Sequence, residues 1–363
     1  MNAIARLTLS FACTIAALPA AQAGEDFQVR YNLAGSLGGE IFAPPDLQGL
    51  TGGIALTRVD IHKITGNDGE RLTQTLPGGT VALPAPTPAA LYPSYGPITG
   101  VIDARGSLVQ WNLGLAWLSA ARYGGGRLAL AVNLPYGIKK QSFSAQATTP
   151  ALNWNPAVPA ATRAAVQAGF DAQVQSTVAA LAAAEGGSVS DIGDMELHAG
   201  WRHATDQVRV LAGASLVLPT GRYNQASGPD IGFGNFYTLR PAAQLVYLPR
   251  PDIALAGRVT VGLNTRNRDN DLRSGNWASL EGAAGYLTRL GPIGVHVVHA
   301  QQFQDDSNNR WGPSRYRSTN AGLFWTTRIP VLDVVLTLQH MATVQSRNAK
   351  NGTYSQLRVS KSF

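Results

Sequence analysis

Segments in which apolar and polar residues alternate constrain this chain more than any other feature. About twelve such segments occur, each over roughly 10 to 14 residues. In 331–344, for example, Leu332, Val334 and Leu336 fall on one face of an extended chain, and Asp333 and Thr337 fall on the other. The pattern predicts β-strands that each have one apolar and one polar face. The predicted strands lie at approximately 52–64, 104–119, 126–142, 192–203, 206–219, 235–248, 252–265, 276–290, 293–304, 317–329, 331–345 and 353–363.

The connections between these strands alternate in length. Short turns are predicted at 121–125, 203–206, 248–252, 290–292 and 328–331. Long connections are predicted at 65–103, 143–191, 220–234, 266–275, 305–316 and 346–352. Outer-membrane barrels have short periplasmic turns at one rim and long extracellular loops at the other. An even number of strands then brings both termini to the short-turn side.

Composition narrows the class of protein. Charged residues make up 14% of the chain and hydrophobic residues 45%, whereas ordinary soluble domains contain about 25% charged residues. After residue 23 no stretch approaches the ~18 uncharged apolar residues that a spanning helix needs. We therefore expect an all-β membrane protein, an antiparallel transmembrane β-barrel of about twelve strands over residues 51–363. The net charge of +7 comes from dispersed arginines and not from basic runs, so no nucleic-acid partner is expected.

Residues 1–23 are expected to form a secretory signal peptide. Arg6 gives a positive n-region, residues 7–18 form the apolar h-region, and a small-residue cleavage pattern precedes Gly24. Cleavage there leaves 340 residues with a net charge of +6, because the removed segment contains Arg6 and no acidic residue. It also removes Cys13, the only cysteine, which excludes disulfides, thiolate metal sites and cysteine nucleophiles in the mature protein.

Two further segments are not predicted as strands. Residues 24–50 are rich in proline and glycine, and we expect a periplasmic or plug-like segment that lies under the barrel or partly fills it. In 160–185, apolar residues recur at helical spacing, which predicts an extracellular loop helix. Such a helix either packs on neighbouring loops or serves as a gate or docking element. Its apolar stripe consists of Val166, Phe170, Val174, Val178 and Leu181.

The polar faces of the strands are expected to line the lumen. Arginines outnumber carboxylates among these residues, which indicates either a ladder of mutual ion pairs or a constriction that attracts anions or polarised aromatic ligands. The residues assigned to the lumen are Arg58, Asp60, His62, Glu196, His198, Arg202, Arg209, Arg240, Arg258, Glu281, Arg289, Arg328, Asp333 and Arg358.

Catalytic and metal-binding motifs are not found in the sequence. The six histidines form no His-x-x-x-His element, and there is no Gly-x-Ser-x-Gly motif. His296 and His299 project to opposite faces of a strand and cannot share a metal ion. We therefore expect no catalytic residue, metal or cofactor, and do not expect an enzyme.

The C-terminal residue gives a separate indication. Phe363 ends an alternating segment, and a terminal Phe resembles the signal by which bacterial outer-membrane barrels engage the barrel-assembly machinery. Lys361 departs from the expected apolar position, but it lies close enough to the rim to extend toward the interface.

Three stretches carry a family resemblance: 191–197 (Asp-Ile-Gly-Asp-Met-Glu-Leu), 218–223 (Leu-Pro-Thr-Gly-Arg-Tyr) and 235–241 (Asn-Phe-Tyr-Thr-Leu-Arg-Pro). They resemble the meta-pathway phenol degradation protein family. That resemblance implies an outer-membrane barrel linked to aromatic catabolism and a transport function. It implies no catalytic residues.

The expected function is therefore an outer-membrane channel or transporter that admits small, largely apolar molecules, with aromatic compounds the favoured class. The alternatives are a non-transporting surface or structural barrel whose long loops bind a partner, and, as a distant third, an outer-membrane hydrolase. Aromatic residues in the predicted long loops are expected to collect such solutes, unless they belong to the interfacial belt and the loop cores. These residues are Tyr92, Tyr95, Trp154, Phe233 and Trp311.

Overall fold

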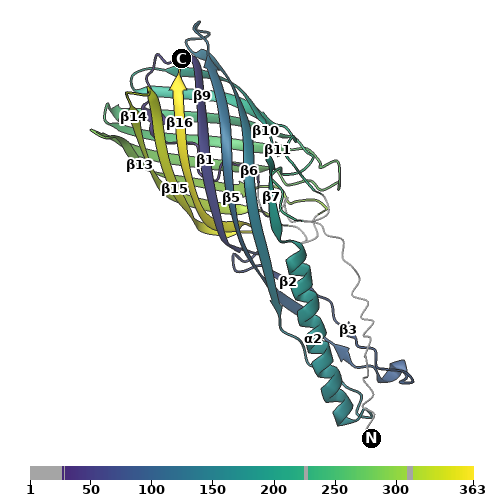
Figure 1. The fold of residues 1–363 in the computed structure, drawn as a ribbon. Helices are drawn as coiled ribbons and strands as arrows, with labels where there is room; N and C mark the ends of the chain where they lie inside the picture. The colour runs from purple at the N-terminus through teal and green to yellow at the C-terminus, as the bar shows by residue number, and fades with distance from the viewer. Residues whose placement is uncertain (1–26, 28, 225–227, 309–313) are drawn as a thin grey trace.

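The protein is described by a computed structural model that covers residues 27, 29–224, 228–308 and 314–363. Its centre is a closed barrel of 12 antiparallel strands (Figure 1). The barrel closes at β1, which pairs with β5 on one side and with the last strand, β16, on the other. The barrel strands are β1 (Gly49–Ile64), β5 (Ile98–Leu118), β6 (Arg127–Ala147), β8 (Glu196–Ala204), β9 (Val208–Val217), β10 (Thr238–Arg250), β11 (Ile253–Asn264), β12 (Trp277–Thr288), β13 (Gly291–Gln302), β14 (Arg317–Ile329), β15 (Val334–Arg347) and β16 (Lys350–Ser362).

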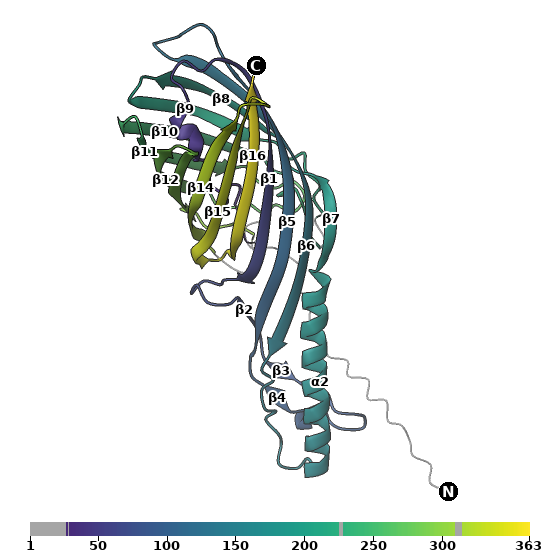
Figure 2. The same cartoon turned by 60° about the vertical axis from the view of Figure 1, so that its left-hand side comes forward.

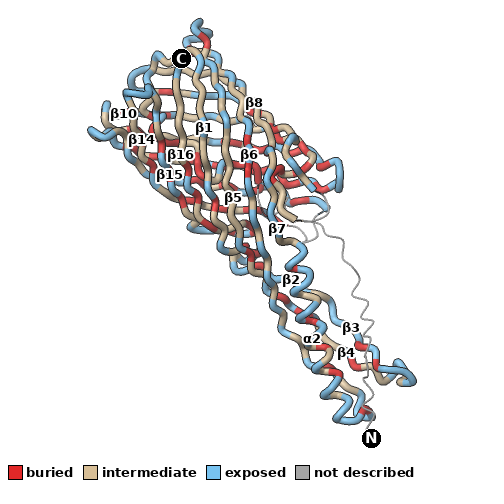
Figure 3. The backbone as a smooth tube through the Cα atoms, viewed as in Figure 1, coloured by how far each residue is buried: buried red, intermediate tan, exposed pale blue. Residues whose placement is uncertain are grey.

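The two faces of the barrel wall differ in polarity, as the alternation predicts. Leu130, Leu255 and Leu323 are among the exposed apolar side chains, whereas Asn320 and Gln339 are among the buried polar ones. This is the inverse of a soluble protein and suits strands that meet lipid outside and polar groups inside. The tube in Figure 3 shows buried and exposed positions alternating along the strands. Among the described residues, no helix is both long and apolar enough to cross a membrane.

One barrel strand is interrupted. β7 (Gly187–Ile192) pairs with the 136–141 part of β6, and β8 pairs with the 127–133 part of the same strand. Pro135 lies on β6 at the interruption, where its carbonyl accepts a hydrogen bond from the Gly193 amide at 2.8 Å. Proline cannot donate to the ladder, and the interruption therefore falls where β6 has no amide to offer.

Residues 29–48, which we name the inner segment, lie inside the barrel and include the short 3₁₀ helix η1 (Gly39–Phe42) (Figure 2). Tyr31 packs edge-on against Trp277 and Tyr316, with ring centroids 6.3 and 5.8 Å apart. At the other end of the segment, Arg202 donates hydrogen bonds to the carbonyls of Pro44 and Pro45. The inner segment therefore starts toward the long-loop rim and runs to the short-turn rim, where β1 begins.

The β5–β6 hairpin continues beyond the barrel as a stalk (Figures 1 and 2). The stalk also contains β2 (Thr73–Leu76), β3 (Gly79–Thr80), η2 (Ala89–Leu91), β4 (Ser94–Tyr95) and α2 (Ala160–Ala184). Val166, Phe170 and Val174 of α2 are buried in a core of its own, and Val178 packs at its edge. The predicted helix is confirmed. Its stripe is wrong at Leu181, which is 58% exposed because α2 runs past the end of that core.

Several boundaries differ from those predicted. β5 begins and β6 ends several residues further into the stalk than expected. The connection expected at 346–352 is only the two residues between Arg347 and Lys350, because β15 and β16 continue into it. β15 and β16 extend beyond the region of alternating residues because they remain hydrogen-bonded to β14 and β1 there.

Candidate functional site

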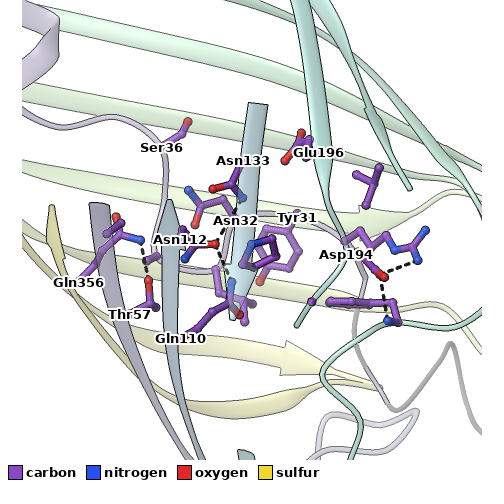
Figure 4. Close-up of a pocket in the computed structure, with 18 of the residues that line it drawn as sticks. Tyr31, Asn32, Ser36, Thr57, Gln110, Asn112, Asn133, Asp194, Glu196 and Gln356 are labelled. Carbon is purple, nitrogen blue, oxygen red and sulfur yellow. Dashed lines mark hydrogen bonds and ion pairs between the residues drawn. The ribbon is translucent and has the colours of Figure 1, made fainter. Parts of the chain in front are cut away.

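Three cavities follow one another along the lumen. The outer pocket, of about 60 Å³, is lined by apolar residues that include Phe27, Ile61 and Phe143. The central cavity, of about 450 Å³, lies beside the inner segment (Figure 4). The lower vestibule, of about 1210 Å³, reaches the short-turn rim.

Shared lining residues connect the cavities. Leu33, Val59, Leu108 and Lys139 line both the outer pocket and the central cavity. The central cavity and the lower vestibule in turn share a narrow set of residues. That set is Ala55, Asn112, Asn133 and Arg358. The cavities therefore form one series from the long-loop half of the barrel to the short-turn rim.

One group of hydrogen bonds from the barrel wall is accepted by backbone carbonyls of the inner segment. Arg240 Nη1 donates to the Arg30 carbonyl at 2.6 Å. Gln339 Nε2 donates to the Leu37 carbonyl at 2.7 Å. Arg209 donates to the carbonyl of Ile41. These bonds, with those from Arg202, fix the course of the segment without depending on its side chains.

Backbone amides and side chains of the inner segment add a second group of contacts. The amide and hydroxyl of Ser36 donate to Glu281 Oε2 at 2.9 and 2.7 Å. The Gly39 amide donates to Thr326 Oγ1 at 3.1 Å. Glu40 forms an ion pair with Arg358 at 3.2 Å. Among the described residues, no hydrogen bond joins the inner segment to β1, β5 or β6. Its contacts with β1 and β5 are apolar instead and include Val59, Ile61 and Leu108.

Arg30 anchors the start of the inner segment to the interrupted strand. Its Nη2 lies 2.8 Å from Asp194 Oδ2, and both side chains are almost fully buried. The guanidinium also stacks over Phe236, 3.8 Å from the ring centroid. Asp194 additionally accepts hydrogen bonds from the amides of Gly221 and Phe233, both at 3.0 Å. The sequence pattern gave no indication of the contact between Asp194 and Arg30.

The structure brings six of the predicted lumen residues to the central cavity: Glu196, His198, Arg240, Arg258, Glu281 and Arg358. Arg240 is ion-paired with Glu196. Arg258 lies opposite Glu281 in the β11–β12 register and donates to Ser36 Oγ at 2.7 Å. Most of these charges therefore have partners, which favours a stiffened wall over a strong field for anions.

Four predicted lumen residues lie toward the short-turn end. Arg202 and Arg209 hold the end of the inner segment. Arg328 and Asp333 line the lower vestibule at its rim and form an exposed ion pair at 2.6 Å. The hydrogen bond from Arg328 lowers the pKa of the Asp333 carboxyl. Arg328 and Asp333 therefore lie at the rim of the barrel and not in its interior.

The prediction is wrong for Arg58 and Asp60. They pair with each other at 2.8 Å, with side chains 64% and 33% exposed, and line none of the three cavities. Val59 between them does line the lumen, so Arg58, Asp60 and His62 share the outer face of β1. Val59 faces inward because it packs in the cluster around Tyr31. Arg289, also assigned to the lumen, lies exposed in the turn between β12 and β13.

The loop aromatics that the structure describes lie in two places. Tyr92, Tyr95 and Trp154 pack against the stalk core, and Tyr95 lies 4.7 Å from the Phe170 ring centroid. They form a loop core and not a free collecting surface. Phe233 lines the central cavity and lies 5.6 Å from the Arg30 guanidinium. Trp311 lies outside the described residues.

Sequence reasoning missed a group of uncharged polar residues on the cavity wall, because it selected charged side chains. Gln110, Asn112 and Gln356 occupy the polar faces of predicted strands, and that position was the available signal. Within the part of the chain that the structure describes, no group of three or more His, Cys, Asp or Glu residues is placed to hold a metal ion.

Residues 93–359 match a protein family described as "Putative MetA-pathway of phenol degradation". The chain belongs to this family. The match covers most of the barrel and much of the stalk, and it agrees with the resemblance carried by the three sequence stretches.

Solved structures give the same fold. An outer membrane channel from Pseudomonas putida F1 superposes with a TM-score of 0.59 at 14% identity, covering 93% of this chain and all of that one. A structure described as the CymD monoaromatic hydrocarbon channel aligns over 92% of this chain and 94% of its own, with 11% identity and a TM-score of 0.36, too low to carry an argument. No curated protein sequence matches the chain. Fold and family thus place this protein among bacterial outer-membrane β-barrels.

Proposed function

We propose that this barrel is an outer-membrane channel for small, largely apolar molecules, with monoaromatic compounds as the favoured class. The observation that carries the proposal is the series of three cavities, whose shared lining residues lie mostly on β1, β5 and β6, the strands to which the inner segment makes no hydrogen bond among the described residues. The link of the family to phenol degradation supports the aromatic class. The channel described for the structural relative from Pseudomonas putida F1 supports permeation over catalysis.

The chemistry of the cavities suits such solutes. Apolar side chains such as Val59 and Leu108 line the central cavity beside polar ones. Aromatic and aliphatic contacts of this kind are individually weak, which allows a solute to bind and to leave. In this proposal the inner segment narrows the lumen, and the charged residues of the cavity stiffen its wall. No catalytic step, metal or cofactor is part of the proposal.

A blocking substitution tests the proposal. Ala55 lies where the central cavity joins the lower vestibule, and Ala55→Trp is expected to abolish protein-dependent uptake of labelled phenol and toluene at low external concentration. Ile54→Trp is the matched control, because Ile54 is 47% exposed on the outer face of the same strand. Equal uptake by cells with and without the protein, together with no conductance in planar bilayers, would reject permeation. The surface-binding alternative would then be preferred, since the stalk has a core of its own.

We also infer that Phe363 is the residue through which the barrel-assembly machinery engages the chain. Its side chain is 73% exposed, and its amide donates to the Leu50 carbonyl at 2.8 Å, beside the seam where β1 and β16 close the barrel. Phe363→Ala is expected to lower the amount of folded protein in the outer membrane. A normal yield of heat-modifiable protein from this variant would contradict the inference.

A further inference from the structure

We propose that the central cavity contains a hydroxyl-recognition subsite that prefers phenols to aromatic molecules of similar shape that lack a hydroxyl donor. This proposal rests on the proposed permeation function and specifies its substrate class. The subsite consists of Thr57, Gln110, Asn112, Asn133 and Gln356, which we name the carboxamide wall. None of these residues was selected by charge, and none is bonded to the inner segment among the described contacts.

The carboxamide wall is continuous across four neighbouring strands. Thr57 on β1 lies opposite Gln356 of β16 and opposite Gln110 of β5 in the barrel register. Asn133 of β6 reaches Asn112 of β5 by a hydrogen bond of 3.3 Å. Figure 4 shows the five side chains grouped together, with Asp194 apart from them, and Glu196 of β8 lies beside Asn133 in the β6–β8 register. The wall is therefore one surface, not a scatter of polar residues.

One hydrogen bond inside the wall turns the amide nitrogen of Gln356 toward Thr57 and its carbonyl oxygen away from Thr57. Gln356 Nε2 donates to Thr57 Oγ1 at 2.8 Å. Oε1, at the other end of the carboxamide, is buried, and Gln356 as a whole is only 8% exposed. This oxygen has no hydrogen-bond partner among the described residues. A buried acceptor without a partner is unfavourable, and a ligand that donates a hydrogen bond relieves that cost.

The rest of the wall presents the same chemistry. Gln110 Nε2 and Asn133 Nδ2 both donate to Asn112 Oδ1, at 2.8 and 3.3 Å. Within the described contacts, no hydrogen bond uses Gln110 Oε1 or Asn133 Oδ1. The amide nitrogens of Gln110, Asn133 and Gln356 are engaged inside the wall, so the carbonyl oxygens of these three residues are left for a donor in the cavity, whereas Asn112 Oδ1 is already occupied. A phenolic O–H is such a donor.

An apolar surface lies close to these oxygens in the same cavity. Val59 and Leu108 flank the wall on β1 and β5, and Leu33 of the inner segment lines the cavity with them. A flat ring suits the apolar surface, while a single hydroxyl reaches the wall. Carboxylate ligands are less suited, because the cavity arginines already have partners: Arg240 pairs with Glu196, Arg358 pairs with Glu40, and Arg258 donates to Ser36. The subsite therefore fits a neutral ring with one hydroxyl group.

Phenol and anisole test the subsite directly. Both carry an oxygen atom attached to the benzene ring, but only the phenol hydroxyl can donate a hydrogen bond. Dissociation constants are measured for the purified full chain in detergent micelles, and each variant is compared with wild type so that partitioning into the micelle cancels. Gln356→Met keeps the side-chain length and removes the acceptor. It is expected to weaken phenol binding roughly 2- to 12-fold, the loss of one neutral hydrogen bond, and to leave anisole binding unchanged.

Two further variants complete the test. Thr57→Val removes the partner that orients Gln356, so it is expected to weaken phenol binding in the same direction and spare anisole. Gln345→Met is the matched control, since Gln345 is exposed and lines none of the three cavities. It is expected to change neither constant.

The outcomes separate the subsite from the channel. Loss of the phenol preference in Gln356→Met supports the subsite whether or not cells show uptake. Parallel changes for phenol and anisole, or no change for either, overturn the subsite and leave the channel proposal to its own uptake test. If wild type binds anisole as tightly as phenol, the subsite is likewise overturned.

Discussion

The guanidinium of Arg30 lies 2.8 Å from the carboxylate of Asp194, and this ion pair joins the inner segment to the interruption between β7 and β8. Asp194 also holds the amides of Gly221 and Phe233, which lie in the loop between β9 and β10. Three parts of the chain that are remote in sequence thus meet at one carboxylate.

Asp194→Asn is expected to destabilise the folded barrel by roughly 3 kcal/mol, because it leaves the buried Arg30 charge without its counter-ion. The midpoint of heat-modifiable gel migration measures the change. Asp60→Asn is the control, since its ion pair with Arg58 is exposed and worth at most about 1 kcal/mol. Equal shifts for the two variants would show that the Arg30–Asp194 pair has no special importance.

Gly39→Val is expected to displace η1 and raise conductance in planar bilayers. A Cβ at Gly39 would overlap the Thr326 side chain, and overpacking of this kind costs about 1 to 3 kcal/mol. Because η1 belongs to the inner segment, the barrel itself should still form. Gly96→Val is the control, since a Cβ there meets no atom within 4 Å. Unchanged conductance in a folded Gly39→Val barrel would argue that the inner segment does not narrow the lumen.

The facing of β11 can be tested by thiol labelling. Arg258 lines the central cavity, whereas Val259 is 47% exposed on the outer face. In cells, Arg258→Cys is expected to react with small water-soluble thiol reagents, and Val259→Cys is expected to be protected by lipid. The mature chain is expected to offer no competing thiol, because Cys13 is the only cysteine and lies in the predicted signal peptide. The opposite labelling pattern would reverse the assignment.

Phe170→Ala is expected to unfold the stalk without affecting the barrel. The ring is buried in the stalk core, and removal of a buried phenylalanine side chain costs about 3 to 5 kcal/mol. Limited proteolysis should then cut within 148–186 while heat-modifiability and phenol uptake stay normal. Leu181→Ala, at an exposed position of the same helix, should change nothing. Loss of uptake in Phe170→Ala alone would assign the stalk a part in transport.

The barrel was predictable because lipid imposes one rule on every spanning strand. Leu255 and Val259 must face outward, and Ala256 and Arg258 then face inward, so alternation reveals both the strand and the orientation of its side chains. The helix at Ala160–Ala184 was predictable because its apolar residues recur at the spacing of a helix instead of a strand. Arg58 and Asp60 escaped the rule because they lie near the long-loop end of β1, where both faces of the wall accept polar groups.

The candidate site was only partly predictable. Alternation places Gln356 on the lumen face, but it does not reveal that Thr57 engages its amide nitrogen and leaves Oε1 without a partner. Nor does the pattern show that the inner segment lies against β8 to β16. That arrangement depends on contacts such as Gln339 to the Leu37 carbonyl, which join residues 302 positions apart in the chain.

Anchoring through main-chain carbonyls has a consequence for how the protein can change. Arg240, Gln339, Arg209 and Arg202 bind oxygens that every amino acid possesses, so these four contacts do not restrict which side chains the inner segment carries. Restrictions apply at Arg30, Ser36 and Gly39, which have contacts of their own. Asn32 and Leu33 point into the central cavity from that scaffold. Substitutions at these two positions can therefore alter the selectivity of the lumen while the backbone of the inner segment keeps its place, in evolution or in engineering.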